Sequence, residues 1–244
     1  MPKSLSARVY IALVIVSGLL LLGDAVLNAH SLPAARFLVL LGLAVVAARL
    51  RIKLPGLTGV MSVNLPFVLL ACALTGTPEA LIVGFVSTFA QCLPRERGKL
   101  NVVQIAFNCC ALTLAVGAAR WIFASPEITS LVAAPPLRLA FAAGVYFLAN
   151  TVMVSTVISL TESASVLKTW TEMFQLSFVY LVASAGAAGL TLVGHEVAWQ
   201  ALLALFPIML GIYQSYRRYF ASAAPGTIAN PALEHSSAAA GAHI

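Results

Sequence analysis

Charged residues are scarce in this chain. Asp, Glu, Lys and Arg make up 9% of its 244 residues, and hydrophobic residues make up 61%. Soluble globular domains carry about 25% charged and about 45–50% apolar residues. A soluble fold would leave much of this apolar surface in water, so the composition excludes a soluble globular protein and predicts an integral membrane protein.

The sequence also lacks the groups of residues that carry enzyme chemistry or hold metal ions. Its four cysteines lie in or at the ends of apolar runs and form no CxxC pair, which indicates neither a zinc site nor a disulfide framework. There is no HExxH, no phosphate-binding glycine loop, no pair of carboxylates and no nucleophile beside a base. We therefore expect no catalytic activity and no metal site, and the sequence leaves any cofactor unknown.

Eight apolar runs fill most of the chain. A helix of about 20 residues crosses the roughly 30 Å of hydrocarbon in a bilayer. The sequence therefore predicts an all-α polytopic bundle over residues 1–220 and a disordered cytoplasmic tail over residues 221–244, which are small, polar and rich in Pro and Gly. The predicted segments are Val9–Asn28, Leu32–Leu50, Val60–Thr75, Pro78–Leu93, Val102–Ala124, Pro136–Leu160, Met173–Val193 and Val197–Tyr216.

The third and fourth segments are short. Val60–Thr75 and Pro78–Leu93 each hold about 16 residues, or roughly 24 Å of helix. They are either short spans or a re-entrant pair packed inside the protein, where backbone groups find partners away from lipid. Both alternatives return the chain to the same side of the membrane, so the later segments keep the same orientation.

Positive charge sets the expected orientation. If the N-terminus is cytoplasmic, 11 of the 14 Lys and Arg residues fall on the cytoplasmic side, and only Arg36, Arg120 and Arg138 fall outside. This partition predicts eight crossings with both termini in the cytoplasm. It accounts for the net charge of +6 without nucleic acid, and the basic clusters are placed to contact anionic lipid headgroups.

Polar side chains at membrane depth are costly unless they find partners, so each is a candidate for an interhelical hydrogen bond or for a ligand site. Gln104 and Asn108 are spaced i, i+4 and share one helical face, which suits both roles. The candidates are Asn64, Gln91, Gln104, Asn108, Asn150, Gln175 and, near a boundary, Glu79.

We expect one polar cavity in the bundle that would bind a ligand. Its walls would hold Asn64, Gln104, Asn108 and Asn150, with Gln91 near the inner end and Glu79 at the outer mouth. For Glu79 the alternative is helix capping, because Thr77 is placed as an N-cap and Pro78 at the first helical position, which puts the carboxylate in the first turn.

Several stretches together resemble a bacterial multi-span membrane module of signalling proteins. They are RIKLPGLTGVMSVNLPFVLL, PEALIVGFVSTFAQCL, VVQIAFNCCALTLAVGAA, YFLANTVMVSTVISLTE, FVYLVASAGAAGL and FPIMLGIYQSYRRYF. In that family the module precedes a cytoplasmic HD-GYP phosphodiesterase or GGDEF cyclase domain of cyclic di-GMP signalling. The resemblance covers nearly all of residues 1–220 and implies a multi-pass protein of the bacterial inner membrane.

The chain departs from this family pattern after Phe220, where only 24 residues follow and no HD-GYP or GGDEF motif is present. The resemblance therefore implies a non-catalytic sensor-like module that binds a small molecule or lipid and acts through partner proteins. Two other functions stay open. One is an accessory subunit of a membrane complex, joined to a protein partner or a second copy. The small residues Ser184, Gly186, Ala187 and Gly189 permit close backbone approach for such a contact, and the alternative for them is packing within the bundle. The other is a transporter or its substrate-binding component, because the chain also resembles the substrate-binding components of energy-coupling-factor transporters.

The charge partition makes a prediction about topology. Reporter fusions after Arg97 and after Arg218 should read cytoplasmic, and fusions near Glu127 and Glu196 should read external, because Lys and Arg near helix ends are retained in the cytoplasm. Paired alkaline phosphatase and fluorescent protein fusions measure this. A cytoplasmic reading at Glu196 would contradict eight crossings.

Overall fold

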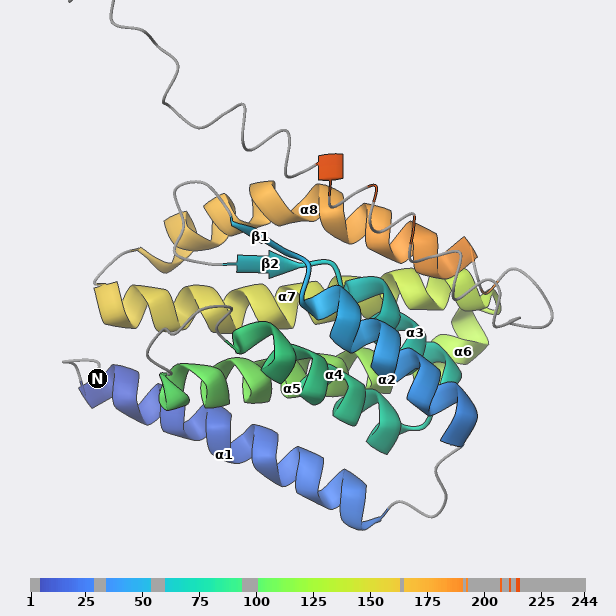
Figure 1. Ribbon diagram of the computed structural model, residues 1–244, viewed down its shortest axis with the longest axis horizontal. Helices are drawn as coiled ribbons and strands as arrows, with labels where there is room; N and C mark the ends of the chain where they lie inside the picture. Colours follow the sequence, from blue (N-terminus) through green and yellow to red (C-terminus); the bar gives the residue numbers. More distant parts are fainter. Residues whose placement is uncertain are drawn as a thin grey trace, which may run out of the picture.

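The computed structural model describes residues 5–28, 34–53, 60–93, 101–162, 165–190 and 192, with single positions at 207, 211, 214 and 215. Across these residues it contains eight helices and one two-stranded sheet (Figure 1). The predicted segment Val197–Tyr216 lies outside the described residues, apart from those single positions, and so does the tail. A helical bundle is therefore shown, and eight crossings remain a prediction.

The long helices follow the apolar runs of the sequence. Three of them are long and apolar enough to cross a membrane: α1 (Leu5–Leu27), α5 (Val102–Ala124) and α7 (Pro135–Glu162). Along the chain, α2 (Ala34–Ala48) follows α1, the short α6 (Pro126–Leu131) lies between α5 and α7, and α8 (Val166–Leu190) follows α7. The predicted segment Val102–Ala124 coincides with α5, since no proline interrupts that run.

The predicted segment Val60–Thr75 is not one helix, and this prediction was wrong. It begins as a strand, β2 (Val60–Ser62), which pairs antiparallel with β1 (Arg51–Lys53). Only α3 (Leu65–Leu74) is helical. β-branched Val60 favours extended backbone, and Pro66 fits the first turn of a helix but not its interior. Among the described residues, this β-hairpin is the one part of the structure that the all-α prediction did not include.

Helix α3 is the centre of the bundle. Its first eight residues, from Leu65 to Cys72, are all buried, and the helix packs against α2, α5, α7, α8 and α4 (Thr77–Cys92). Ten residues span about 15 Å, which is half of a bilayer core. Short length and burial on every side fit the re-entrant alternative, in which this segment is surrounded by protein. The exposed apolar side chains lie instead on outer helices such as α1, as expected for a surface that faces lipid.

Glycines allow two helices to approach α5 closely. A Cβ added at Gly18 of α1 would lie 2.5 Å from Cys110 Cβ and 2.8 Å from the Cys110 Cα. A Cβ at Gly84 of α4 would lie 2.9 Å from a Val116 methyl group. Small residues at such crossings let the backbones of membrane helices meet, and they fix how α1 and α4 sit on α5.

The Gly18 contact makes a prediction about stability. Gly18→Val should destabilise the protein by about 1–3 kcal/mol, because the new side chain meets backbone atoms that cannot move aside. Gly23→Val on the same helix is the matched control, since a Cβ there has nothing within 4 Å. Thermal unfolding in detergent measures both variants, and equal melting temperatures would show that α1 does not depend on this crossing.

Candidate functional site

Polar side chains gather along the C-terminal half of α4. The Asn64 amide donates to Ser87 Oγ (Nδ2···Oγ 3.1 Å), and the Asn108 amide donates to Cys92 Sγ (Nδ2···Sγ 3.7 Å). Ser87 and Cys92 belong to α4, whereas Asn64 precedes α3 and Asn108 belongs to α5. We call Arg49, Asn64, Ser87, Cys92 and Asn108 the α4 polar cluster.

Arg49 holds the C-terminal end of α4. Its Nη1 donates to the carbonyl oxygens of Ala90 (3.0 Å) and Leu93 (3.4 Å). The last carbonyls of a helix have no partner within the helix and carry partial negative charge, so a guanidinium placed there is stabilising. Arg49 directly follows α2, and this contact ties the end of α2 to the end of α4. From the sequence alone, Arg49 counted only as a cytoplasmic charge.

Asn64 joins the start of α3 to α4. It is 6% exposed, and its carbonyl accepts the N–H groups of Phe67 and Val68 at the start of the helix. Its side chain makes no capping hydrogen bond to α3 and reaches Ser87 instead. Ser87 Oγ in turn donates to the Gly84 carbonyl (3.1 Å). The amide, the hydroxyl and the carbonyl thus form a buried chain of hydrogen bonds between two helices.

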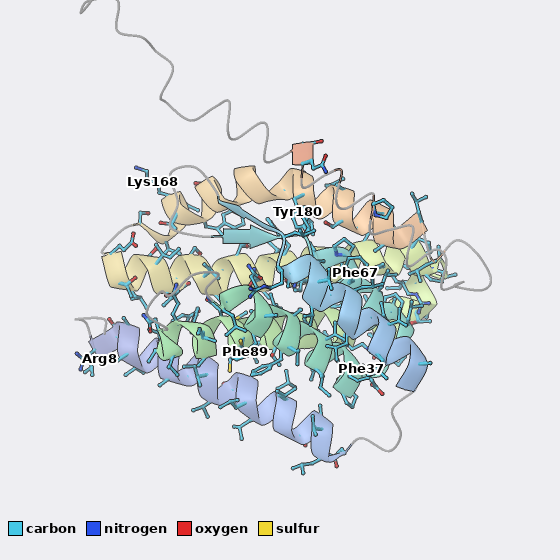
Figure 2. The ribbon with its side chains drawn as sticks, viewed as in Figure 1. Arg8, Phe37, Phe67, Phe89, Lys168 and Tyr180 are labelled. Carbon is cyan, nitrogen blue, oxygen red and sulfur yellow. The ribbon has the colours of Figure 1, made fainter. Side chains whose placement is uncertain are left out.

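The hydroxyl of Tyr180, on α8, is the partner of the first N–H of α3. The Leu65 N–H donates to Tyr180 Oη (3.3 Å), and Pro66, which follows, has no N–H to satisfy. Tyr180 is buried, and Figure 2 shows it just below the α8 ribbon, with Phe67 lower in the view. Tyr146 of α7 is also buried and lies within electrostatic range of Tyr180. Three helices therefore meet around the start of α3.

The residues predicted to line one cavity have different environments. Asn64, Gln91 and Asn108 lie on or against the C-terminal half of α4, where Gln91 is half-buried. Gln104 is exposed and Asn150, on α7, is half-buried. Convergence of all six on one cavity remains a prediction. The side chain of Gln175 lies outside what the structure describes.

Glu79 lies at the opposite end of α4, twelve residues before Gln91. It is 3% exposed, and its Oε2 is buried without a hydrogen-bond partner. The N-cap of α4 is Gly76, and Thr77 is already helical, so the prediction of Thr77 as N-cap was wrong by one residue. A Cβ at position 76 would lie 2.5 Å from Glu79 Oε2, so glycine is the residue that leaves room for the carboxylate over the turn.

Sequence reasoning missed Ser87 and Tyr180. One hydroxyl in an apolar helix carries no local signal, and the spacing of residues in α4 and α8 does not identify the helix that each will face. Asn64 was found because an amide within an apolar run is costly without a partner, whatever the partner is. Among the described residues no three His, Cys, Asp or Glu side chains are grouped to hold a metal ion. His30 and His195 lie outside those residues.

The small residues of α8 divide between two faces. Ser184 is buried and Gly189 approaches Pro136 of α7, where an added Cβ would lie 3.6 Å from the Pro136 Cβ, so these two positions pack within the bundle. Gly186 is exposed, and a Cβ there would have nothing within 4 Å. Contact with a protein partner through this stretch stays a prediction.

Comparison with known proteins gives one match. Residues 24–216 match the model of the MASE9 family, a membrane sensor domain of the MASE type, which typically stands N-terminal to cyclic di-GMP signalling domains. No curated protein and no solved structure shows significant similarity to the chain. The match covers every described helix except most of α1, and it confirms the resemblance to a signalling membrane module.

The start of α3 makes a prediction about stability. Tyr180→Phe should lower the free energy of unfolding by about 1–3 kcal/mol, because it leaves the buried Leu65 N–H without an acceptor. Tyr10→Phe is the control, since the Tyr10 hydroxyl donates at 3.3 Å to the Met153 carbonyl inside α7, and its loss leaves no N–H unpaired. Thermal unfolding compares the two, and an effect of Tyr10→Phe as large as that of Tyr180→Phe would contradict this reading.

Proposed function

Because the chain belongs to the MASE9 family of membrane sensor domains, which are not themselves catalytic, we propose that it binds a small molecule or lipid inside its bundle and acts on a partner protein. The observation that carries the proposal is the buried polar surround of the start of α3. Asn64, Ser87 and Tyr180 are all buried there, at the end of a helix that is enclosed by others.

The chemistry of this surround suits a ligand that accepts hydrogen bonds. The N-terminal end of a helix carries partial positive charge, and the Asn64 amide and the Tyr180 hydroxyl can each donate. A carbonyl, hydroxyl or phosphate oxygen of a small molecule or lipid headgroup matches those donors. A bundle that needed only packing would be equally well served by apolar side chains, which avoid the cost of burying an amide.

The contacts of α4 offer a route from the ligand to a partner. Arg49 precedes the β-hairpin and Asn64 follows it, and both side chains are held by the C-terminal half of α4. A ligand that takes the place of Ser87 as the partner of Asn64 would change the hold of α4 on the hairpin. The hairpin carries Arg51 and Lys53, which the charge partition places at the cytoplasmic face, where an output partner would bind.

The proposal predicts a loss of bound ligand in matched variants. Purified protein in mild detergent should carry a co-purifying small molecule or lipid that native mass spectrometry detects. Asn64→Leu should reduce its retention at least about tenfold, because the amide donor is lost. Asn28→Leu is the control, since that amide is exposed directly after α1 and donates to Asp24 of that helix.

The double variant separates a shared site from independent packing. If Asn64 and Asn108 contribute to one site, Asn64→Leu and Asn108→Leu should reduce retention non-additively when combined. Additive losses of thermal stability with no change in any bound species would leave these amides a structural role only. Co-purification of a protein and of no small molecule would favour an accessory subunit instead.

A further inference from the structure

A second pair of buried polar groups lies at the other end of α4, away from the α4 polar cluster. Glu79 Oε2 has no hydrogen-bond partner, and neither has the buried Nε atom of Arg120, a half-buried residue near the C-terminal end of α5. A buried carboxylate without a partner is costly, and so is a buried guanidinium nitrogen. Of the four buried side-chain atoms in the described residues that lack a partner, these two carry opposite charges on adjacent helices.

The register of α4 and α5 puts the two groups in one layer. The helices run antiparallel, with Gly84 opposite Val116 and Cys92 opposite Asn108. Five residues back from Gly84 along α4 is Glu79, and the matching position on α5 is Trp121, the neighbour of Arg120.

Arg120 follows Val116 by four residues, so the two share the face of α5 that meets α4. Its guanidinium acts electrostatically on Cys72, which is buried in the last turns of α3, four residues before Gly76. Gly76 is in turn the residue against which the Glu79 carboxylate lies. The α3–α4 turn therefore has a carboxylate on it and a guanidinium beside it.

We propose that Glu79 and Arg120 bind a small zwitterion of the free amino acid class, with its ammonium group on the Glu79 carboxylate and its carboxylate on the Arg120 guanidinium. A simple cation is a poor ligand here because Arg120 repels it, and a simple anion is a poor ligand because Glu79 repels it. A zwitterion supplies a donor to Oε2 and an acceptor to Nε at once, which satisfies both atoms. This site is separate from the one around Asn64, and it would exist whether or not that one binds a ligand.

Arg138 and Glu127 also lie at this end and have contacts of their own, although Nε of Arg138 is likewise buried without a hydrogen-bond partner. Nη1 of Arg138 donates to Thr129 (2.8 Å), and its guanidinium lies 5.1 Å from the centre of the Phe123 ring. Glu127 is exposed, and the Ser125 hydroxyl donates to its carboxylate, which lowers the pKa of that carboxyl. Glu127 is therefore a matched control for Glu79, because it lies on α6, directly after α5, but on the surface.

The test uses the full chain in lipid nanodiscs, with free amino acids as probes and with propionate and ethylamine as the two halves of alanine. Isothermal titration should detect binding of at least one amino acid and of neither half-molecule. Glu79→Gln and Arg120→Gln should each weaken that binding at least tenfold, and Glu127→Gln should leave it unchanged. Absence of binding by all twenty amino acids would overturn the proposal.

A switch in specificity distinguishes binding from a structural role. With its repelling carboxylate removed, Glu79→Gln should bind propionate better than the unchanged protein does, and its preference for the amino acid over propionate should fall at least tenfold. If Glu79→Gln only loosened the fold, it would bind the amino acid and propionate more weakly by the same factor. An unchanged preference for the amino acid over propionate would therefore contradict a binding site at Glu79. The Asn64→Leu experiment measures a different quantity, the co-purifying molecule seen by native mass spectrometry. A negative result with added amino acids would therefore leave the proposed site around Asn64 unaffected.

Discussion

The fold depends on enclosing α3, a ten-residue helix that is too short to cross a bilayer. Its ends are buried inside the protein, so each backbone polar group there needs a hydrogen-bond partner away from bulk solvent. The Leu65 N–H finds the Tyr180 hydroxyl, and the Asn64 carbonyl accepts two N–H groups of the first turn. Helix α8 supplies the Tyr180 hydroxyl, and the tight crossing at Gly84 holds α4 against α5, two of the helices that pack on α3.

Helix α4 links the two polar regions of the bundle. Its C-terminal half is bonded by Arg49 from α2, by Asn64 ahead of α3 and by Asn108 from α5, and its first turn carries the buried Glu79. Side chains from three other parts of the chain thus depend on where α4 sits. A shift of α4 along its axis would change all of these contacts together, which is the property that a two-state element in a sensor requires.

The sequence predicts much of the helical framework, because long, mainly apolar runs such as Val102–Ala124 leave the backbone no other way to satisfy its hydrogen bonds in lipid. It predicts that Asn64 and Glu79 are special, since burying an amide or a carboxylate is costly in any fold. It does not predict the strand at Val60–Ser62, whose partner Arg51–Lys53 is chosen by tertiary pairing. It does not predict Ser87 or Tyr180 either, because their roles arise from the helix that each one faces.

Glu79 has two features that need separate explanations, its position in the first turn of α4 and its burial in the bundle. A carboxylate in the first turn of a helix is stabilised by the helix dipole, and this is sufficient reason for an acid there on an exposed helix. Here the same carboxylate is 3% exposed, lies against Gly76 and leaves Oε2 without a partner, so the dipole does not replace the hydration that is lost on burial. Arg120 is half-buried, its Nε atom is buried without a partner, and the register of α4 and α5 puts it in the same layer of the bundle. Two incomplete groups of opposite charge are therefore more simply explained by a molecule that completes both than by two independent costs to the fold.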